Sequence, residues 1–330
     1  MAKSAAYYNV ADFNEYKRKH GKCLPPLVNV LTAACHFQEF LDAKKITYGF
    51  IGGLPMLCLG YKREMPDLHI AYDAKDFERL KSKLENNHRV RLPTGMNPLL
   101  PFKVLLWSGP EYKDEGCSIN ASIELSFVPS GAHGAPGGTD LTKSLVLLGL
   151  KTASGRQMLF KSLNVQYLLT TLLFHCKACD LSWDPRKDIL FLCKNETVAV
   201  QRVRTRLNAK EVKEMFLGTS FFSRLKSQDQ RLCYRALLDT EPPPTMAIIP
   251  PAPQYYSRQQ APEQSNESRT PRSRYRNASG ARSSSDSATE GGTAKKMQMQ
   301  SREHVQDPMQ ATHIQSVQFD QIRLFDKDTG

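Results

Sequence analysis

The chain has 330 residues and a formal net charge of +12, with 40% hydrophobic and 24% charged residues. This composition is typical of a globular protein with additional polar sequence, and the longest apolar runs, such as residues 145–148, are far too short to span a bilayer. The positive charge is compatible with binding to nucleic acid or acidic surfaces but does not require it.

The first residues, MAKSAAYYNVADFNEYKRKH, contain no apolar core. We therefore expect no signal peptide, no membrane partner, and a cytoplasmic or nuclear protein. Eight cysteines are scattered along the chain, and without export we expect them to remain reduced.

Apolar residues recur with helical or strand spacing over roughly residues 1–240. The predicted elements are a helix at 27–41, a strand at 46–51, a helix at 55–59, a strand at 68–72, a helix at 74–86, strands at 102–107 and 119–128, and mostly helical segments at 158–180 and 185–217. Strands that alternate with helices predict an α/β or α+β fold with a small mixed sheet and flanking helices. We place the sheet domain at residues 1–150 and a helical region packed on it at 151–240.

Residues 241–330 form a tail rich in Pro, Ser, Arg and Gln, with few branched apolar residues. Such sequence cannot bury enough apolar surface to offset the entropy of ordering, so we expect most of the tail to be disordered. Arg272, Arg274 and Arg276 alternate with small or aromatic residues there and could contact nucleic-acid phosphates, or form only a solvated basic tail. Apolar residues return at 314–325, as a docking motif for a partner or a frayed end.

A predicted strand ends at Gly52 and Gly53, directly before a predicted helix. Glycines let the backbone approach a ligand closely, and the free N–H groups of a helix start favour phosphate. Lys62 and Arg63 follow and could reach the same anion. Asp67, at the start of the next strand, could hold Mg²⁺, which prefers oxygen ligands.

Glu124, on a later predicted strand, could face the same point as Asp67. Amides for the phosphates and carboxylates for a metal are the groups that phosphoryl chemistry needs. Each feature also has a simpler interpretation: the Gly-Gly pair as a turn, Asp67 as a loop residue, and Glu124 as a solvent-facing residue on an edge strand.

His175, Cys176 and Cys179 are spaced like ligands of zinc. A structural zinc site needs four ligands, and no second pair follows at matching spacing. Cys193 and Cys233 are distant, so core packing is the favoured interpretation of these cysteines.

The segment 52–69, with Gly60, Arg63 and Asp67, resembles the signature of the nucleotidyltransferase-fold superfamily, which has the form GG…LLG-x-x-R-x-T-x-D-I-D. The chain looks most like the fungal nucleotidyltransferase-like proteins, and more distantly like antitoxin-linked bacterial members. The run KDILFL at 187–192 resembles a helical segment that follows in the same family. The resemblance covers roughly residues 27–216 and implies a sheet of nucleotidyltransferase type.

This resemblance implies a role for each matching residue. Gly52, Gly53 and Arg63 would bind the nucleotide. Asp67 would be the first acid that holds Mg²⁺. Glu124 would be the third acid, which ligates metal and draws the proton from the attacking hydroxyl.

Two positions depart from the family pattern. The second metal-binding acid is replaced by His69, and the family's threonine by Met65. Imidazole is a poor ligand for Mg²⁺, so the resemblance implies a degenerate metal site with weak or lost Mg²⁺ binding.

These observations predict a nucleotidyltransferase-like protein that binds a nucleoside triphosphate, with weak or lost transfer of a nucleoside monophosphate to a hydroxyl acceptor. The alternative is a non-catalytic interaction or nucleic-acid-binding protein that uses the basic tail, with nucleic acid or protein as partner. Whether the chain is an enzyme stays open at this point.

Overall fold

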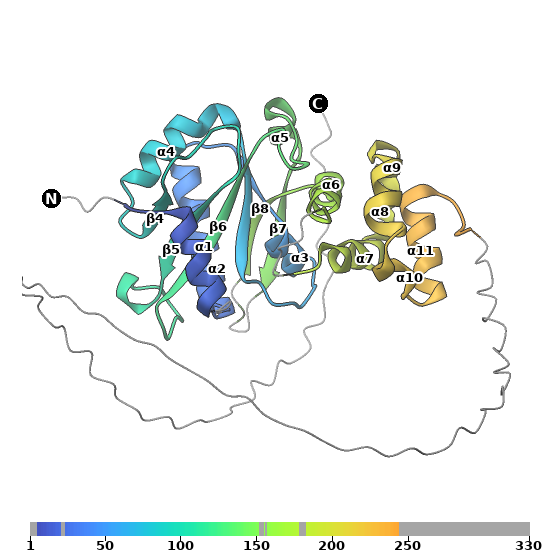
Figure 1. The fold of residues 1–330 in the computed structure, drawn as a ribbon, viewed down its shortest axis with the longest axis horizontal. Coiled ribbons are helices and arrows are strands. Elements are labelled where there is room, and N and C mark those ends of the chain that lie inside the picture. Colours follow the sequence, from blue (N-terminus) through green and yellow to red (C-terminus); the bar gives the residue numbers. More distant parts are fainter. Residues whose placement is uncertain (1–4, 21–23, 152–154, 156, 178–182, 244–330) are drawn as a thin grey trace, which may run out of the picture. The chain divides into compact units, whose positions relative to one another are not determined.

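The core of the fold is a mixed sheet with the strand order β1-β4-β5-β6-β3-β2-β8-β7 (Figure 1). Its strands are β1 (Ala6–Tyr8), β2 (Tyr48–Ile51), β3 (Asp67–Tyr72), β4 (Val90–Pro93), β5 (Phe102–Ser108), β6 (Ala121–Pro129), β7 (Leu145–Lys151) and β8 (Gln157–Leu163). The structure is a computed structural model that describes residues 5–20, 24–151, 155, 157–177 and 183–243, with only the backbone of 16–20. All of these residues belong to one compact unit.

Strand β3 lies near the middle of the sheet, antiparallel to β2 and parallel to β6. Register places Asp67 opposite Glu124 and His69 opposite Ser126. Strands β5 and β6 are antiparallel, whereas β2 and β8 are parallel. The prediction of a mixed sheet with flanking helices is therefore confirmed.

One face of the sheet packs against α2 (Leu27–Ala43) and α4 (Phe77–Glu85). Helix α2 has its apolar residues at helical spacing, and Val30, Phe37 and Leu41 are fully buried against the strands. From β3 the residues on this face are Leu68, Ile70 and Tyr72.

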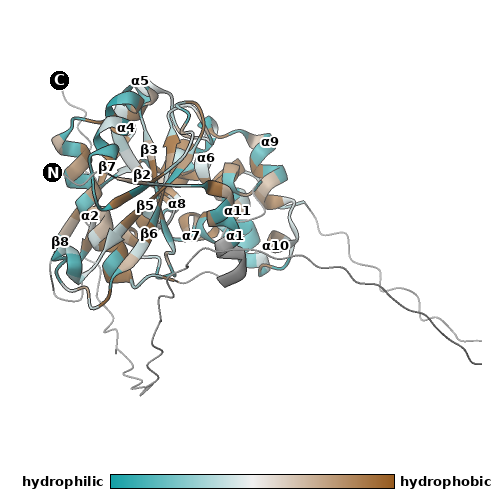
Figure 2. Ribbon diagram, turned by 60° about the vertical axis from the view of Figure 1, so that its left-hand side comes forward, coloured by the Kyte–Doolittle hydropathy of each residue, from teal (hydrophilic) through white to brown (hydrophobic). Residues whose placement is uncertain are grey.

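The alternate strand residues contribute to a second apolar cluster on the opposite face, because successive side chains of a strand point to opposite sides. Ile51, Ala71 and Val128 join this cluster from β2, β3 and β6. Residues of α5, α6, α7 and α11 complete it, and Figure 2 shows hydrophobic residues concentrated on the central strands. Both faces of the central strands are therefore buried.

The helices on the second face begin with side-chain caps where the sequence supplies them. Asn164 accepts a hydrogen bond from the backbone N–H of Tyr167, and Asp184, just before Pro185, accepts one from Arg186. The remaining helices are α1 (Val10–His20), α3 (Gly53–Cys58), α5 (Gly138–Lys143), α6 (Val165–His175), α7 (Pro185–Asn195), α8 (Thr197–Val203), α9 (Ala209–Val212), α10 (Ser220–Ser223) and α11 (Ser227–Leu238), with a π-helical turn at Lys213–Leu217.

The helix predicted to begin at residue 158 was wrong at its start, because Gln157–Leu163 is strand β8. Its seven residues pair along their whole length with β7, and Phe50 of β2 pairs with Ser162. The pairing of β8 with these two distant strands decides its conformation, although its local sequence pattern favours a helix. The sheet thus takes its last strand from beyond residue 150, and the division into domains at that point stays a prediction.

Among the described residues, none of the helices has the length and apolarity that crossing a bilayer requires. The basic cluster Arg272, Arg274 and Arg276, the apolar residues at 314–325 and the rest of the tail from residue 244 lie outside the described residues.

Candidate functional site

Gly52 and Gly53 form the turn between β2 and α3. Gly52 has a φ of +69°, a conformation that favours glycine. At Gly53 a Cβ atom would lie 3.0 Å from Cγ of Met65 and 3.1 Å from Nη2 of Arg63. Helix α3 has only six residues, so the Gly-Gly turn serves mainly to admit the close passage of the segment that carries Arg63 and Met65.

Arg63 lies over this turn and is held by two other parts of the chain. Its Nη2 donates a 2.9 Å hydrogen bond to Oδ2 of Asp188 on α7, and its guanidinium carbon lies 4.7 Å from the ring centre of Trp183. Asp188 is fully buried. The ion pair therefore joins the segment 52–69 to the segment 187–192, the two parts of the sequence that carry the family resemblance.

Asp67 and Glu124 lie side by side on β3 and β6. Ile123 and Leu125, the neighbours of Glu124, pack into the cluster on the α2 side, so Glu124 points to the opposite face. Asp67 and His69 share that face, because their neighbours Leu68 and Ile70 also pack on the α2 side.

Each of the two carboxylates has a basic partner. Nζ of Lys103 on β5 donates to Oε2 of Glu124 at 3.2 Å, and Nε2 of His69 lies 3.2 Å from Oδ2 of Asp67. Burial alone would raise the pKa of the Asp67 carboxyl, but His69, with Lys103 and Arg63, outweighs it and lowers that pKa. Asp67 is therefore a carboxylate near neutral pH.

Around His69 the second face carries His175 of α6 and Trp183. The ring centres of His69 and His175 are 5.4 Å apart, and those of His69 and Trp183 are 6.3 Å apart. Burial, with a smaller contribution from the nearby His69, lowers the pKa of His175 to about 3, so His175 is neutral over the physiological range. Burial also raises the pKa of Asp188 to about 6, against the opposing charge of Arg63.

Several buried polar atoms of this cluster have no hydrogen-bond partner among the described residues. They are Arg63 Nε, both ring nitrogens of His69, His175 Nδ1, Trp183 Nε1 and Asp188 Oδ1. The contact of His69 with Asp67 is close enough for an ion pair but lacks the alignment of a hydrogen bond. Buried polar groups are usually satisfied, so such a concentration of unpaired donors and acceptors indicates a place where a polar ligand or water completes the bonding.

The donor set does not fit the Mg²⁺ site that the resemblance implies. Within the part of the chain that the structure describes, no three His, Cys, Asp or Glu side chains are placed to hold one metal ion. Asp67 faces an imidazole where the family has a second carboxylate, and Glu124 is already paired with Lys103. Hard cations require oxygen ligands, so no chemical step is assigned to a metal here.

The structure brings together Gly52, Gly53, Arg63, Asp67 and Glu124, the predicted site residues, with His69 among them. Lys62 is exposed beside them. Sequence reasoning missed Lys103, Trp183 and His175 as neighbours of the site. Only Lys103 carried a signal, as the single charged residue of the apolar strand at 102–107.

The proposed alternative of zinc at His175 and Cys176 gains no support among the described residues, and Cys179 lies outside them. Burial raises the pKa of the Cys176 thiol to about 12, as expected for a cysteine of the apolar core. The six cysteines that the structure describes are all free thiols.

No protein-family model matches the chain, and no curated protein matches it significantly. Among solved structures, the chain is similar to the lincosamide antibiotic adenylyltransferase LnuA in its lincomycin-bound form, with 17% identity over 47% of this chain and 90% of that chain and a TM-score of 0.27. It is also similar to TM1012 of Thermotoga maritima, whose assignment as a nucleotidyltransferase is itself provisional, with 13% identity over 51% and 86% of the two chains and a TM-score of 0.25. TM-scores this low do not define a common fold, and function has to be inferred from the site itself.

Proposed function

We propose that the chain is a nucleotidyltransferase-like protein that binds a nucleoside triphosphate beside Gly52 and Gly53, with weak or lost transfer of a nucleoside monophosphate to a hydroxyl. The observation that carries this proposal is the convergence on one sheet face of residues far apart in sequence. Arg63 and Asp67 of segment 52–69 lie with Glu124 of β6 and with Asp188 of α7, where buried polar atoms lack partners.

In this proposal the chain's own groups do the binding. Arg63 offers a planar guanidinium to the phosphates, and the glycine turn keeps the backbone close to them. Asp67 and Glu124 are the groups that would order the acceptor hydroxyl or a cation. Their pairing with His69 and Lys103 offsets the negative charge that a two-metal mechanism uses, so we propose that Mg²⁺ binding is weak or lost.

The same pairing favours the second candidate, a non-catalytic protein that uses this face of the sheet for interaction. Both carboxylates have a basic partner within the protein, since Lys103 pairs with Glu124 and Nε2 of His69 lies 3.2 Å from Asp67. The tail that could supply nucleic-acid contacts lies outside the described residues.

A thermal-shift experiment separates these candidates. The full chain is heated with each of the four ribonucleoside triphosphates, with and without Mg²⁺. Stabilisation that is lost in Asp67→Asn and Arg63→Ala, but kept in the exposed control Asp12→Ala, supports a nucleotide site at this face. No stabilisation by any triphosphate in the wild type would reject it. If binding is found, release of pyrophosphate with a hydroxyl acceptor present distinguishes residual transfer from binding alone.

A further inference from the structure

A second polar region lies at the edge of the same sheet, around the end of β5. A pocket of about 430 Å³ opens there. Its lining residues are Ala6, His88, Val90, Arg91, Trp107, Glu111, Tyr112 and Asn120. None of them belongs to the site around Asp67.

The pocket combines an exposed arginine and an exposed histidine with aromatic rings. His88 and Arg91 are exposed, whereas Trp107 and Tyr112 are half-buried. The guanidinium carbon of Arg91 lies 5.4 Å from the ring centre of Trp107, and the rings of His88 and Tyr112 are 6.2 Å apart. Proteins that bind single-stranded nucleic acid combine aromatic rings, on which the bases stack, with positive charges that contact the phosphates.

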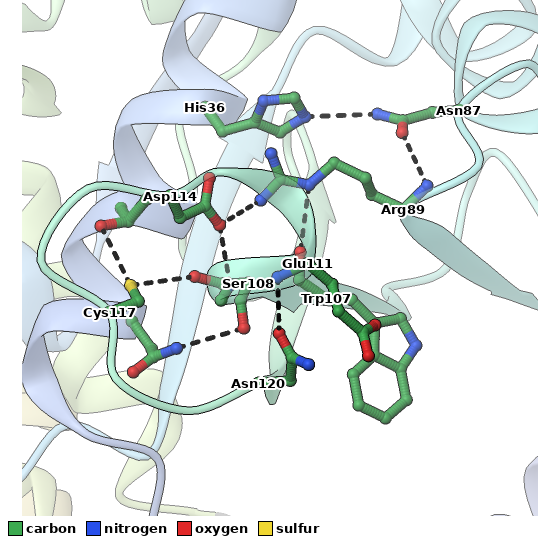
Figure 3. Close-up of polar contacts among 12 residues, drawn as sticks. His36, Asn87, Arg89, Trp107, Ser108, Glu111, Asp114, Cys117 and Asn120 are labelled. Carbon is green, nitrogen blue, oxygen red and sulfur yellow. Dashed lines mark hydrogen bonds and ion pairs between the residues drawn. The ribbon is translucent and has the colours of Figure 1, made fainter.

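The walls of the pocket are held rigidly by a network behind it (Figure 3). Arg89 is buried, and its Nε donates to the carbonyl oxygen of Trp107 at 3.1 Å while its Nη2 donates to Asp114. The guanidinium of Arg89 also stacks 4.7 Å from the ring centre of Tyr112. Both aromatic walls are therefore positioned before any ligand arrives, which lowers the entropic cost of binding.

Polar groups on the rim suit the edges of bases. Oδ1 of Asn120 accepts a hydrogen bond from the backbone N–H of Glu111, which fixes the orientation of the amide (Figure 3). The Asn120 amide nitrogen can then donate to a base carbonyl. Glu111 is exposed and can accept from an exocyclic amino group. The carboxylate of Glu111 repels a phosphate only close to itself, since Arg91 and His88 line the same pocket.

The register of the sheet connects this pocket to the candidate site. Asp67 pairs with Glu124, Glu124 with Leu105, and Leu105 with Arg91, so one row crosses β3, β6, β5 and β4. Three strand spacings separate the ends of this row, a distance of about 14 Å. Lys103 is exposed on the same face between them. Leu105, in the middle of this row, is buried, so a strand bound at the pocket would pass over the exposed Lys103 to reach the two carboxylates.

We propose that the pocket around Arg91 and Trp107 binds a single-stranded nucleic acid whose end is the hydroxyl acceptor at Asp67 and Glu124. This inference names the acceptor class and rests on the proposed function for the reaction. The binding step itself is independent of triphosphate.

Binding is measured by fluorescence anisotropy with the full chain and no triphosphate. The probes are labelled single-stranded RNA and DNA oligonucleotides of about 12 nucleotides, within the range that one binding surface covers. Arg91→Glu and Trp107→Ala are each expected to weaken binding by about fivefold or more, because stacking and phosphate contact are lost. Trp107→Phe keeps an aromatic surface and is expected to retain most of the affinity.

The matched control is Arg202→Glu, which makes the same charge change at an exposed position of α8. Equal weakening by Arg91→Glu and Arg202→Glu would assign the binding to general charge and overturn the proposal, as would the absence of binding to both probes. A preference for RNA or DNA identifies the acceptor strand. The stabilisation of Arg91→Glu by triphosphate is measured in parallel. If this stabilisation persists while oligonucleotide binding falls, the two sites are separate. The proposed triphosphate site and the proposed oligonucleotide site can then be rejected independently of each other.

Discussion

The two polar clusters of the sheet differ in how completely their buried groups are bonded. Arg89 directs Nε to a backbone carbonyl and Nη2 to Asp114, and Asp114 also accepts from the N–H of Gly109. In that network Oδ1 of the buried Asn29 lacks a partner among the described residues, whereas around His69 six buried nitrogen and oxygen atoms of five side chains lack one. A network whose buried polar groups are bonded stabilises the fold. Buried polar groups without partners lower the stability of the fold, and their presence indicates that a ligand binds there.

The largest loss of stability is expected when the network around Arg89 is broken. Asp114→Ala removes the partner of a buried guanidinium whose side chain is 10% exposed, and we expect a loss of about 3–5 kcal/mol of unfolding free energy. Chemical denaturation measures it. The exposed pair of Lys210 and Glu214 supplies the control, since Glu214→Ala should cost no more than about 0.5 kcal/mol. Equal costs would mean that the Arg89 network does not support the fold.

The same network predicts how stability depends on pH. Burial, with smaller contributions from Arg89 and His88 and against the opposing charge of Asp114, lowers the pKa of His36 to about 4. The unfolded chain binds this proton from about pH 6.5, so folding loses stability as pH falls from 6.5 to 4. We expect the stability of His36→Gln to fall by about 3 kcal/mol less over this window. Parallel denaturation series at several pH values measure the difference, and identical pH profiles would contradict it.

A smaller effect is expected at the incomplete cluster. Burial raises the pKa of Asp188 to about 6 although Arg63 is bound to it, so its charged form is costly. A raised carboxyl pKa removes stability as pH rises from about 4 to 6. Asp188→Asn should therefore cost about 1 kcal/mol or less at pH 7, well below Asp114→Ala, and should abolish that pH-dependent loss. A cost equal to that of Asp114→Ala would erase the distinction between the clusters.

The last prediction concerns the affinity for Mg²⁺ at position 69. His69→Asp places a second carboxylate beside Asp67, which restores the family pattern and should raise Mg²⁺ affinity by about tenfold or more. Isothermal titration with Mg²⁺ measures this, with His88→Asp as the exposed control. Unchanged affinity in His69→Asp would show that position 69 does not face a cation.

Local sequence patterns predicted the elements that carry the site. The helix at 27–41 and the strands at 46–51, 68–72, 102–107 and 119–128 are all present, because each pairs a clear apolar period with turn residues at its ends. The glycine turn and the position of Asp67 at the start of β3 followed from the same patterns.

Other features depend on contacts between distant residues. Strand β8 was predicted as helix because its pairing with β2 and β7 is not encoded in its own seven residues. A Cβ at Gly49 would lie 2.8 Å from Cδ2 of Leu145, so the close packing of β2 at this glycine involves a strand nearly a hundred residues away. Likewise, the partners Lys103 and Asp188 become visible only once the register of the sheet and the packing of α7 are known.

In the ion pair between Arg63 and Asp188, the carboxylate of Asp188 competes with any anion that would bind to Arg63. Asp188 is a carboxylate tethered beside the guanidinium that an incoming phosphate needs, and it occupies that guanidinium at 2.9 Å. A singly charged anion gains little by displacing it. A triphosphate carries several negative charges and makes several contacts, so it can displace this carboxylate. A triphosphate bound at the proposed site would therefore have to displace Asp188 from Arg63, and this would release α7 from the segment that carries Arg63.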